Sequence, residues 1–279
     1  MKIGSTGALF DCYGEKRYEK MREFGFLYRD FGIRGELNGM SEDDYFASIR
    51  AEAELAKASG VTIWQAHGPW RYPPHDETPE LRAERFEVMA RGIRAAGMIG
   101  CRYWVIHPLM PYGPDADFDL DRFYEINYDH FRRLLPVAKE SGVVICFENM
   151  PMKRLTISTP EKTLEFIRAI NDENFRMCLD TGHVSVHELS PADAVRMAGK
   201  DLAVLHVHDN MGKRDDHMTP ATGVIDWADF GAALTEIGFN GVYSLESGWK
   251  DFLPHVSNDT RLRALRAVLD EIVPGGVTD

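Results

Sequence analysis

The chain has 279 residues, of which 44% are hydrophobic and 11% aromatic, so it can bury a large core, and a disordered or fibrous chain is excluded. Its 32 basic and 44 acidic residues give a formal net charge of −12, which disfavours nucleic acid and anionic membranes, because clustered Lys and Arg bind those partners. The sequence shows no bilayer-spanning apolar run and no signal-peptide pattern at its start, so we expect a cytoplasmic protein.

Short apolar runs recur along the chain and predict eight β-strands. They cover residues 2–5, 33–37, 61–66, 102–106, 143–147, 176–179, 203–207 and 241–245. Several of them are continuous apolar runs, such as VVICF, which is typical of parallel strands covered on both faces.

Longer amphipathic segments fill the gaps and predict helices. Ser41 begins one of them, with acidic residues in its first turn. In another, Thr78 is suited to cap the helix and Pro79 to take its first position. The predicted helices cover residues 15–24, 41–58, 78–97, 121–140, 160–170, 190–198, 226–237 and 259–272.

Eight strand–helix units in one chain predict an α/β fold, a single (β/α)8 TIM barrel over residues 1–279 with its active site at the C-terminal ends of the strands. The competing architecture is an open, doubly wound sheet. Such a sheet usually carries GxGxxG after its first strand, and the segment GSTGALFDCYG does not fit that pattern. Two long loops, residues 108–119 and 209–225, follow strands and would lie on the active-site face.

Polar side chains able to bind metal stand at the ends of six successive predicted strands: His67, His107, Glu148, Asp180 with His183, His206 with His208, and Glu246. Any one of them is more often a structural residue, but a barrel directs all of them at one cavity. Carboxylates gathered there repel one another and lose hydration, which costs several kcal/mol unless a cation compensates. The sequence therefore predicts a divalent metal ion.

Two Glu, one Asp and one His form a mixed oxygen and nitrogen ligand set. Such a set suits Mn²⁺, Zn²⁺, Co²⁺ or Mg²⁺, and its oxygen majority favours Mn²⁺. His206 and His208 are two residues apart on a strand, so both point to the barrel interior. We favour His206 as the ligand and His208 as a supporting or substrate contact, with the reverse assignment left open.

The loop after the seventh strand contains a second group of polar residues. Asp215 and His217 are candidates to reach a metal or the substrate together with His183, and Arg214 offers positive charge to a hydroxyl, carboxylate or phosphate. Aromatic residues that follow strands are candidate walls for a sugar ring, and equally candidates for packing: Trp70, Tyr112 and Trp249.

The segments FEN at 147–149, LDTGH at 179–183, HVHDN at 206–210 and LES at 245–247 resemble, in order and strand position, the xylose-isomerase-like TIM-barrel superfamily. This group of sugar phosphate isomerases and epimerases also contains the endonuclease-IV-type AP endonucleases. Similarity to ketose 3-epimerases implies one metal ion, proton exchange between the substrate and two glutamates, and hydroxyl binding by His183 and Arg214. The implied metal ligands are Glu148, Asp180, His206 and Glu246, and the implied catalytic pair is Glu148 with Glu246.

Similarity to the AP endonucleases implies more metal ligands, and all of those positions are filled here. They are His67 and His107 beside Glu148, and Asp215 and His217 beside His183. One departure is Thr222, which stands where the family often carries a Glu, so any role of that Glu is vacant. Family members are often dimers or tetramers, which implies a homo-oligomer, although no motif here fixes one.

These observations give three hypotheses. The first is a metal-dependent isomerase or epimerase of a sugar, sugar phosphate or related keto-polyol, working by proton transfer through a metal-stabilised enediolate. The alternative is a multi-metal phosphoesterase acting on abasic DNA, which the filled ligand positions support and the net charge opposes. The third is a non-catalytic barrel that only binds a sugar or assists a partner subunit.

Overall fold

The computed structural model describes residues 1–70, 76–111, 119–249 and 252–278, and its centre is a barrel of parallel strands. The strands are β1 (Lys2–Ser5), β2 (Tyr28–Gly32), β3 (Thr62–His67), β4 (Tyr103–Ile106), β5 (Val144–Glu148), β6 (Phe175–Asp180), β7 (Leu202–His206) and β8 (Val242–Leu245). Hydrogen bonds join them in the order β7-β6-β5-β4-β3-β2-β1-β8. The two ends of this order meet where the Val207 amide donates to the Ser244 carbonyl oxygen (2.8 Å) and the Glu246 amide donates to that of Val207 (3.0 Å). The predicted (β/α)8 barrel is confirmed.

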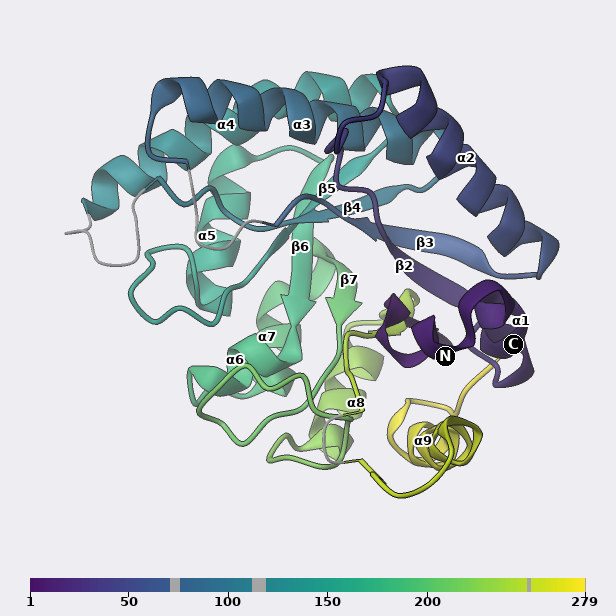
Figure 1. The fold of residues 1–279 in the computed structure, drawn as a ribbon. Coiled ribbons are helices and arrows are strands. Elements are labelled where there is room, and N and C mark those ends of the chain that lie inside the picture. Colours follow the sequence, from purple (N-terminus) through teal and green to yellow (C-terminus); the bar gives the residue numbers. More distant parts are fainter. Residues whose placement is uncertain (71–75, 112–118, 250–251, 279) are drawn as a thin grey trace.

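Helices cover the outside of the barrel, and Figure 1 shows α2, α3 and α4 side by side along one edge. The α-helices are α1 (Arg17–Glu23), α2 (Glu42–Ala58), α3 (Pro79–Met98), α4 (Leu120–Glu140), α5 (Pro160–Ile170), α6 (Thr181–Val186), α7 (Pro191–Ala198), α8 (Trp227–Glu236) and α9 (Asn258–Ile272). Short 3₁₀ turns are η1 (Gly7–Leu9), η2 (Asp11–Lys16) and η3 (Gly199–Asp201). The predicted caps are present, since the hydroxyls of Ser41 and Thr78 accept hydrogen bonds from amides at 3.1 and 3.2 Å.

Packing outside β5 explains how a site residue comes to face the barrel interior. The Phe147 ring is fully buried, and its centroid lies 4.9 Å from the rings of Phe131 on α4 and Phe166 on α5. Burying a Phe side chain contributes about 1.5–3 kcal/mol to the stability of the fold. This contribution favours the orientation of β5 in which Phe147 points outward, to the surrounding helices. Because successive side chains on a strand point to opposite faces, Glu148 is directed into the barrel.

The second strand is the one element that the sequence analysis misplaced. The prediction was residues 33–37, whereas β2 is Tyr28–Gly32, where Tyr28 pairs with both Gly4 and Thr62. Arg29 and Asp30 interrupt the apolar pattern of this strand, and both are buried. The other seven predicted strands agree with the observed ones to within one residue at each end.

Helix α6 was not predicted, because all six of its residues are buried and so show no alternation of polar and apolar faces. The Asp180 carboxylate caps it by accepting the His183 amide at 2.6 Å. The two termini lie side by side (Figure 1), where the Met1 amino group donates to the Gly276 carbonyl oxygen at 2.6 Å. Within the described residues, no helix is both long enough and apolar enough to cross a bilayer.

Candidate metal centre

A cavity of about 570 Å³ opens at the C-terminal ends of the strands. Among its lining residues are eight that the sequence analysis singled out: His67, Trp70, His107, Glu148, His183, Asp215, His217 and Glu246. Three more of the predicted residues, Asp180, His206 and His208, have no exposed surface. The strand ends thus direct nearly all of the predicted site residues to one place.

Four of these residues form what we name the inner cluster: Glu148, Asp180, His206 and Glu246. One ligand atom from each lies within 4.8 Å of all the others. His206 Nδ1 is 3.0 Å from Glu148 Oε1 and 2.8 Å from Glu246 Oε2. The side chains of Glu148 and Asp180 are almost fully buried, while that of Glu246 is 22% exposed and borders the cavity.

Behind His206 lies Asp30, a residue that the sequence analysis missed. Its Oδ2 atom is 2.9 Å from His206 Nε2, and it also accepts a hydrogen bond from Gln65 Nε2 at 2.9 Å. A carboxylate only accepts hydrogen bonds, so Nε2 carries a hydrogen and Nδ1 is turned toward the inner cluster. Histidines that ligate metals are commonly oriented in this way by a carboxylate. The signal available in the sequence was a charged residue inside an apolar run.

His67 and His107 lie beside the buried Glu148. The Nε2 atoms of His67 and His107 are 3.5 Å and 3.0 Å from Glu148 Oε2, and the two imidazole centroids are 4.9 Å apart. These three residues form a group of metal-capable atoms, and the His67 ring also stacks on the His206 ring, with centroids 5.5 Å apart. Glu148 is therefore shared between two candidate metal positions.

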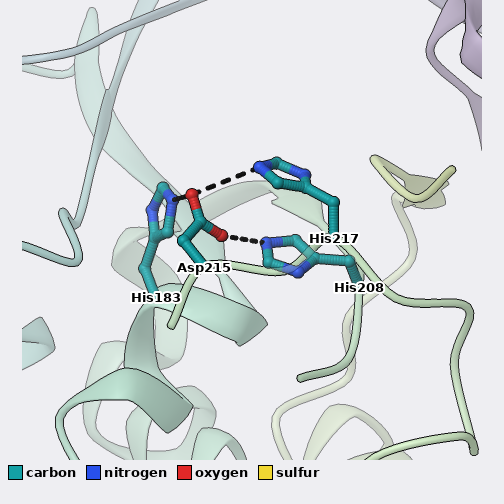
Figure 2. Close-up of side chains that lie close together, drawn as sticks. All are labelled: His183, His208, Asp215 and His217. Atoms are coloured by element: carbon teal, nitrogen blue, oxygen red, sulfur yellow. Dashed lines mark hydrogen bonds and ion pairs between the residues drawn. The ribbon is translucent and has the colours of Figure 1, made fainter. Parts of the chain in front are cut away.

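A further group, which we name the outer cluster, consists of His183, His208, Asp215 and His217. Figure 2 shows Asp215 between the three imidazoles. Its Oδ2 atom is 3.2 Å from the Nε2 atoms of both His183 and His217, and its Oδ1 atom is 3.5 Å from His208 Nε2. The rings of His208 and His217 are stacked, with centroids 4.2 Å apart.

His208 joins the two clusters. Its Nε2 atom is 3.0 Å from Asp180 Oδ1, and its backbone amide donates to the Thr181 hydroxyl at 3.0 Å. His206 contacts two carboxylates of the inner cluster, whereas His208 contacts Asp180 and the outer cluster. This geometry favours His206 over His208 as the histidine of the inner cluster.

The inner cluster is strongly negative, as its pKa shifts show. Burial opposes a charge on His206, but Cys178, Glu246 and Glu148 raise its pKa well above the ordinary value. Burial raises the pKa of Glu246, but His206 lowers it, to about 2. Without a metal ion, the cluster therefore holds a proton on an imidazole that faces its carboxylates. A site of this charge and donor chemistry fits a divalent cation.

The outer cluster has the same electrostatic character. Burial disfavours the charged forms of His183 and His217, yet nearby carboxylates raise both pKa values to about 10. For His183 the largest of these influences is Asp180, and for His217 it is the contact with Asp215. Asp215 has its own pKa lowered, against the effect of burial, by His183 and His217. The outer cluster is thus also suited to hold a cation.

Some predicted residues lie apart from the cavity. Arg214 is 79% exposed, forms an ion pair with Asp216 at 3.4 Å, and is not among the residues that line the cavity. Trp249 stacks on Phe252 at 6.1 Å between centroids and does not line the cavity either. Trp70 does line it, 6.5 Å from the His107 ring, whereas the candidate Tyr112 lies outside the described residues.

The fold and the site together define an α/β barrel with carboxylate and imidazole clusters at the carboxyl ends of its strands. The chain belongs to the xylose isomerase-like TIM barrel family, whose sequence profile matches residues 18–272. This confirms the resemblance inferred from the motifs.

Among known proteins, the chain is similar to two D-psicose 3-epimerases. It is 26% identical over 201 residues to that of Ruminiclostridium cellulolyticum, covering 68% of this chain and 65% of that protein. It is 26% identical over 281 residues to that of Enterocloster bolteae, covering 92% of this chain and 88% of that protein. The crystal structure of D-psicose 3-epimerase with D-tagatose from Clostridium cellulolyticum H10 superposes with a TM-score of 0.81 at 20% identity, covering 98% of this chain and all of that one.

Proposed function

We propose that this protein is a divalent-metal-dependent isomerase or epimerase of a sugar, sugar phosphate or related keto-polyol. The observation that carries the proposal is the inner cluster, in which two glutamates from β5 and the end of β8 meet one imidazole beside a cavity of about 570 Å³. Cavities of this size hold small molecules. The similarity to D-psicose 3-epimerases supports a sugar as the substrate.

The residues that would hold the ion are Glu148, Asp180, His206 and Glu246. Their oxygen majority favours Mn²⁺, with Zn²⁺, Co²⁺ and Mg²⁺ as alternatives. A divalent ion held there supplies polarisation of a carbonyl oxygen and stabilises the negative charge that develops on it.

The chain's own part in the reaction is proton transfer. Glu246 is the more exposed of the two glutamates, and a positive charge next to it, on His206 or on a bound cation, lowers its pKa and keeps its carboxylate ionised at neutral pH. It is suited to take the proton from the carbon next to the carbonyl group. Glu148, on a neighbouring part of the cavity wall, returns a proton to the other face. Its contact with His107 Nε2, at 3.0 Å from Oε2, gives it a route for exchanging that proton.

Deuterium uptake from heavy water tests this proposal directly. We expect the manganese-loaded protein to place deuterium on one carbon of a ketose from a panel of free and phosphorylated ketohexoses and ketopentoses. Glu246→Gln should abolish the uptake while leaving the fold intact, because it removes the base but keeps the size of the side chain. A matched control is Glu165→Gln on the exposed surface of α5. Normal uptake by Glu246→Gln with every accepted sugar would refute the proton-transfer role.

A second candidate function is a multi-metal phosphoesterase, because metal-capable residues extend beyond the inner cluster. His67 and His107 lie against Glu148, and the outer cluster adjoins Asp180 through His208. Metal counting separates the two candidates: about one ion per chain favours the isomerase, and about three favour the phosphoesterase. Incubation with an abasic DNA duplex at low salt should give no cleavage if the first proposal is right, and cleavage that depends on His67 would favour the second.

A further inference from the structure

The cavity also has a polar wall formed by β2, and Arg29 is the buried basic residue of that wall. Arg29 is the second residue of β2 and is only 7% exposed, yet it lines the cavity beside Gly7, Asp11 and Arg34. Its Nε and Nη1 atoms are fully buried and have no hydrogen-bond partner within the described residues. The third guanidinium nitrogen, Nη2, is therefore the one that can reach the cavity.

Two buried or half-buried carboxylates near Arg29, those of Glu52 and Asp30, are bonded to other groups. Both oxygens of Glu52 lie 2.6 Å from Arg17 Nη2, and the Tyr18 hydroxyl donates to Oε1 at 2.6 Å. Asp30, the next residue along β2, is held by His206 and Gln65. Within the described residues, Arg29 also faces the Tyr18 ring, 6.0 Å from its guanidinium carbon, and its charge helps to lower the pKa of Glu52 after Arg17 and Tyr18.

A buried charge without a partner is costly, and a fold normally pairs it or hydrogen-bonds it. The guanidinium presents planar donors that match the oxygens of a carboxylate or phosphate. Gly7 leaves space at Arg29 Nη2, since a Cβ atom at that position would lie 2.7 Å from Nη2 and 2.6 Å from Asp11 Oδ1. Arg34, exposed on the same side of the cavity, adds a second positive charge, and the exposed Asp11 subtracts one.

The cavity lining therefore carries both signs of charge, and Asp11 and Asp30 lie on the same wall as Arg29 and Arg34. Glu148, Asp215 and Glu246 are among the lining residues that would hold metal, whereas Arg29 and Arg34 are the basic residues of the lining on and just after β2. We infer that the wall at Arg29 binds an oxyanion carried by the substrate, so that the sugar of the proposed function is an anionic one, with a phosphate or carboxylate remote from its carbonyl group. This inference rests on the proposed function for the sugar, but it rests on Arg29 alone for the anion.

Calorimetric titration of the manganese-loaded protein with three sugars tests the inference. The sugars share one carbonyl end and differ at carbon 6: D-fructose, D-fructose 6-phosphate and D-fructuronate. We expect at least one anionic sugar to bind tenfold or more tightly than D-fructose, which corresponds to about 1.4 kcal/mol. The preferred anion identifies phosphate or carboxylate as its source. Arg29→Met should abolish the preference, and Arg102→Met, an equal change of charge at the N-terminal end of the barrel, should keep it.

A second measurement covers the case in which none of these sugars binds. Sulfate should raise the midpoint of thermal unfolding of the wild-type protein and of Arg102→Met by several degrees more than that of Arg29→Met. In the absence of any anion, Arg29→Met should unfold at the same or a higher temperature, because it removes an unpaired buried charge; a purely structural arginine would instead leave a less stable protein. Gly7→Ala should weaken the sulfate effect by crowding Nη2 without removing charge.

The outcomes separate this inference from the proposed function. An anion preference or a sulfate effect that survives in Arg29→Met, or neither effect in the wild-type protein, overturns the proposed anion site. Glu246→Gln should keep the Arg29-dependent effects while losing deuterium uptake. Loss of the Arg29 effects with normal deuterium uptake from neutral sugars would leave the proposed function standing, and the reverse result would leave only the proposed anion site.

Discussion

Replacing Asp30 by Asn tests whether the carboxylate behind His206 matters for metal binding. In the wild-type protein, Asp30 Oδ2 lies 2.9 Å from His206 Nε2. The substitution keeps the size of the side chain and leaves one oxygen atom there, but it removes the negative charge. It also turns one acceptor into an amide, beside the Gln65 amide that donates to the same carboxylate at 2.9 Å. Carboxylates in this position typically change metal affinity by about 10–100-fold. We therefore expect Asp30→Asn to weaken Mn²⁺ binding by that factor, or about 1.4–2.7 kcal/mol.

The assay is competition for Mn²⁺ with a chromophoric chelator, at constant pH and salt. Asp43→Asn, the same substitution at an exposed position in the first turn of α2, serves as the control and should bind Mn²⁺ as the wild type does. Circular dichroism confirms that both variants are folded. If folded Asp30→Asn binds Mn²⁺ within twofold of the wild type, then His206 is not oriented by Asp30, or it is not a ligand, and the account of the inner cluster given above is wrong.

Three other predictions concern stability. Burial, and after it Arg133 and Arg85, lowers the pKa of His130 to about 3, so between pH 6.5 and about 3 only the unfolded chain takes up a proton at this residue. As the pH falls through this range, His130 should lower the free energy of unfolding by about 1.4 kcal/mol per pH unit. Urea titrations should show a smaller loss of stability for His130→Phe, and equal losses in the two proteins would refute the assignment. Gly182→Ala should cost about 1–3 kcal/mol in the same assay, because its Cβ would overlap the buried His208 ring; an unchanged midpoint would mean that His208 moves freely. Adding Mn²⁺ at 100 times its dissociation constant should stabilise the wild type by about 2.7 kcal/mol and Glu246→Gln by less at the same concentration, and an equal gain in both would remove Glu246 from the ligand set.

Much of the barrel could be predicted because most of its strands are short apolar runs that can be recognised in the sequence. The run around Phe147 is apolar since its outward side chains pack on α4 and α5 and its inward side chains fill the barrel. The site residues could be found for a related reason. A parallel barrel gathers strand ends at one mouth, so the position of Glu148 or Asp180 directly after an apolar run was enough to place it.

The contacts among those residues could not be predicted from strand ends. Arg214 follows the same strand as Asp215, yet it is exposed on the surface while Asp215 is surrounded by imidazoles. The difference arises from the course of a loop, in which His217 takes a positive φ of 46° and its Nδ1 lies 2.7 Å from the Glu246 carbonyl oxygen. Long-range contacts of this kind have no counterpart in the spacing of residues along the chain.

The misplaced second strand leads to a more general point about this site. β2 was missed because Arg29 and Asp30 look unsuited to a buried strand, and each is there at a cost to stability. Asp30 offsets that cost by bonding to His206 and Gln65, whereas two guanidinium nitrogens of Arg29 have no hydrogen-bond partner among the described residues. When a buried charge has no partner within the fold that offsets its desolvation cost, a bound ligand of opposite charge can offset it. The two charged residues that concealed the strand are therefore the ones through which β2 would contribute to the proposed metal site and the proposed anion site, and the Arg29→Met titrations decide whether the anion site exists.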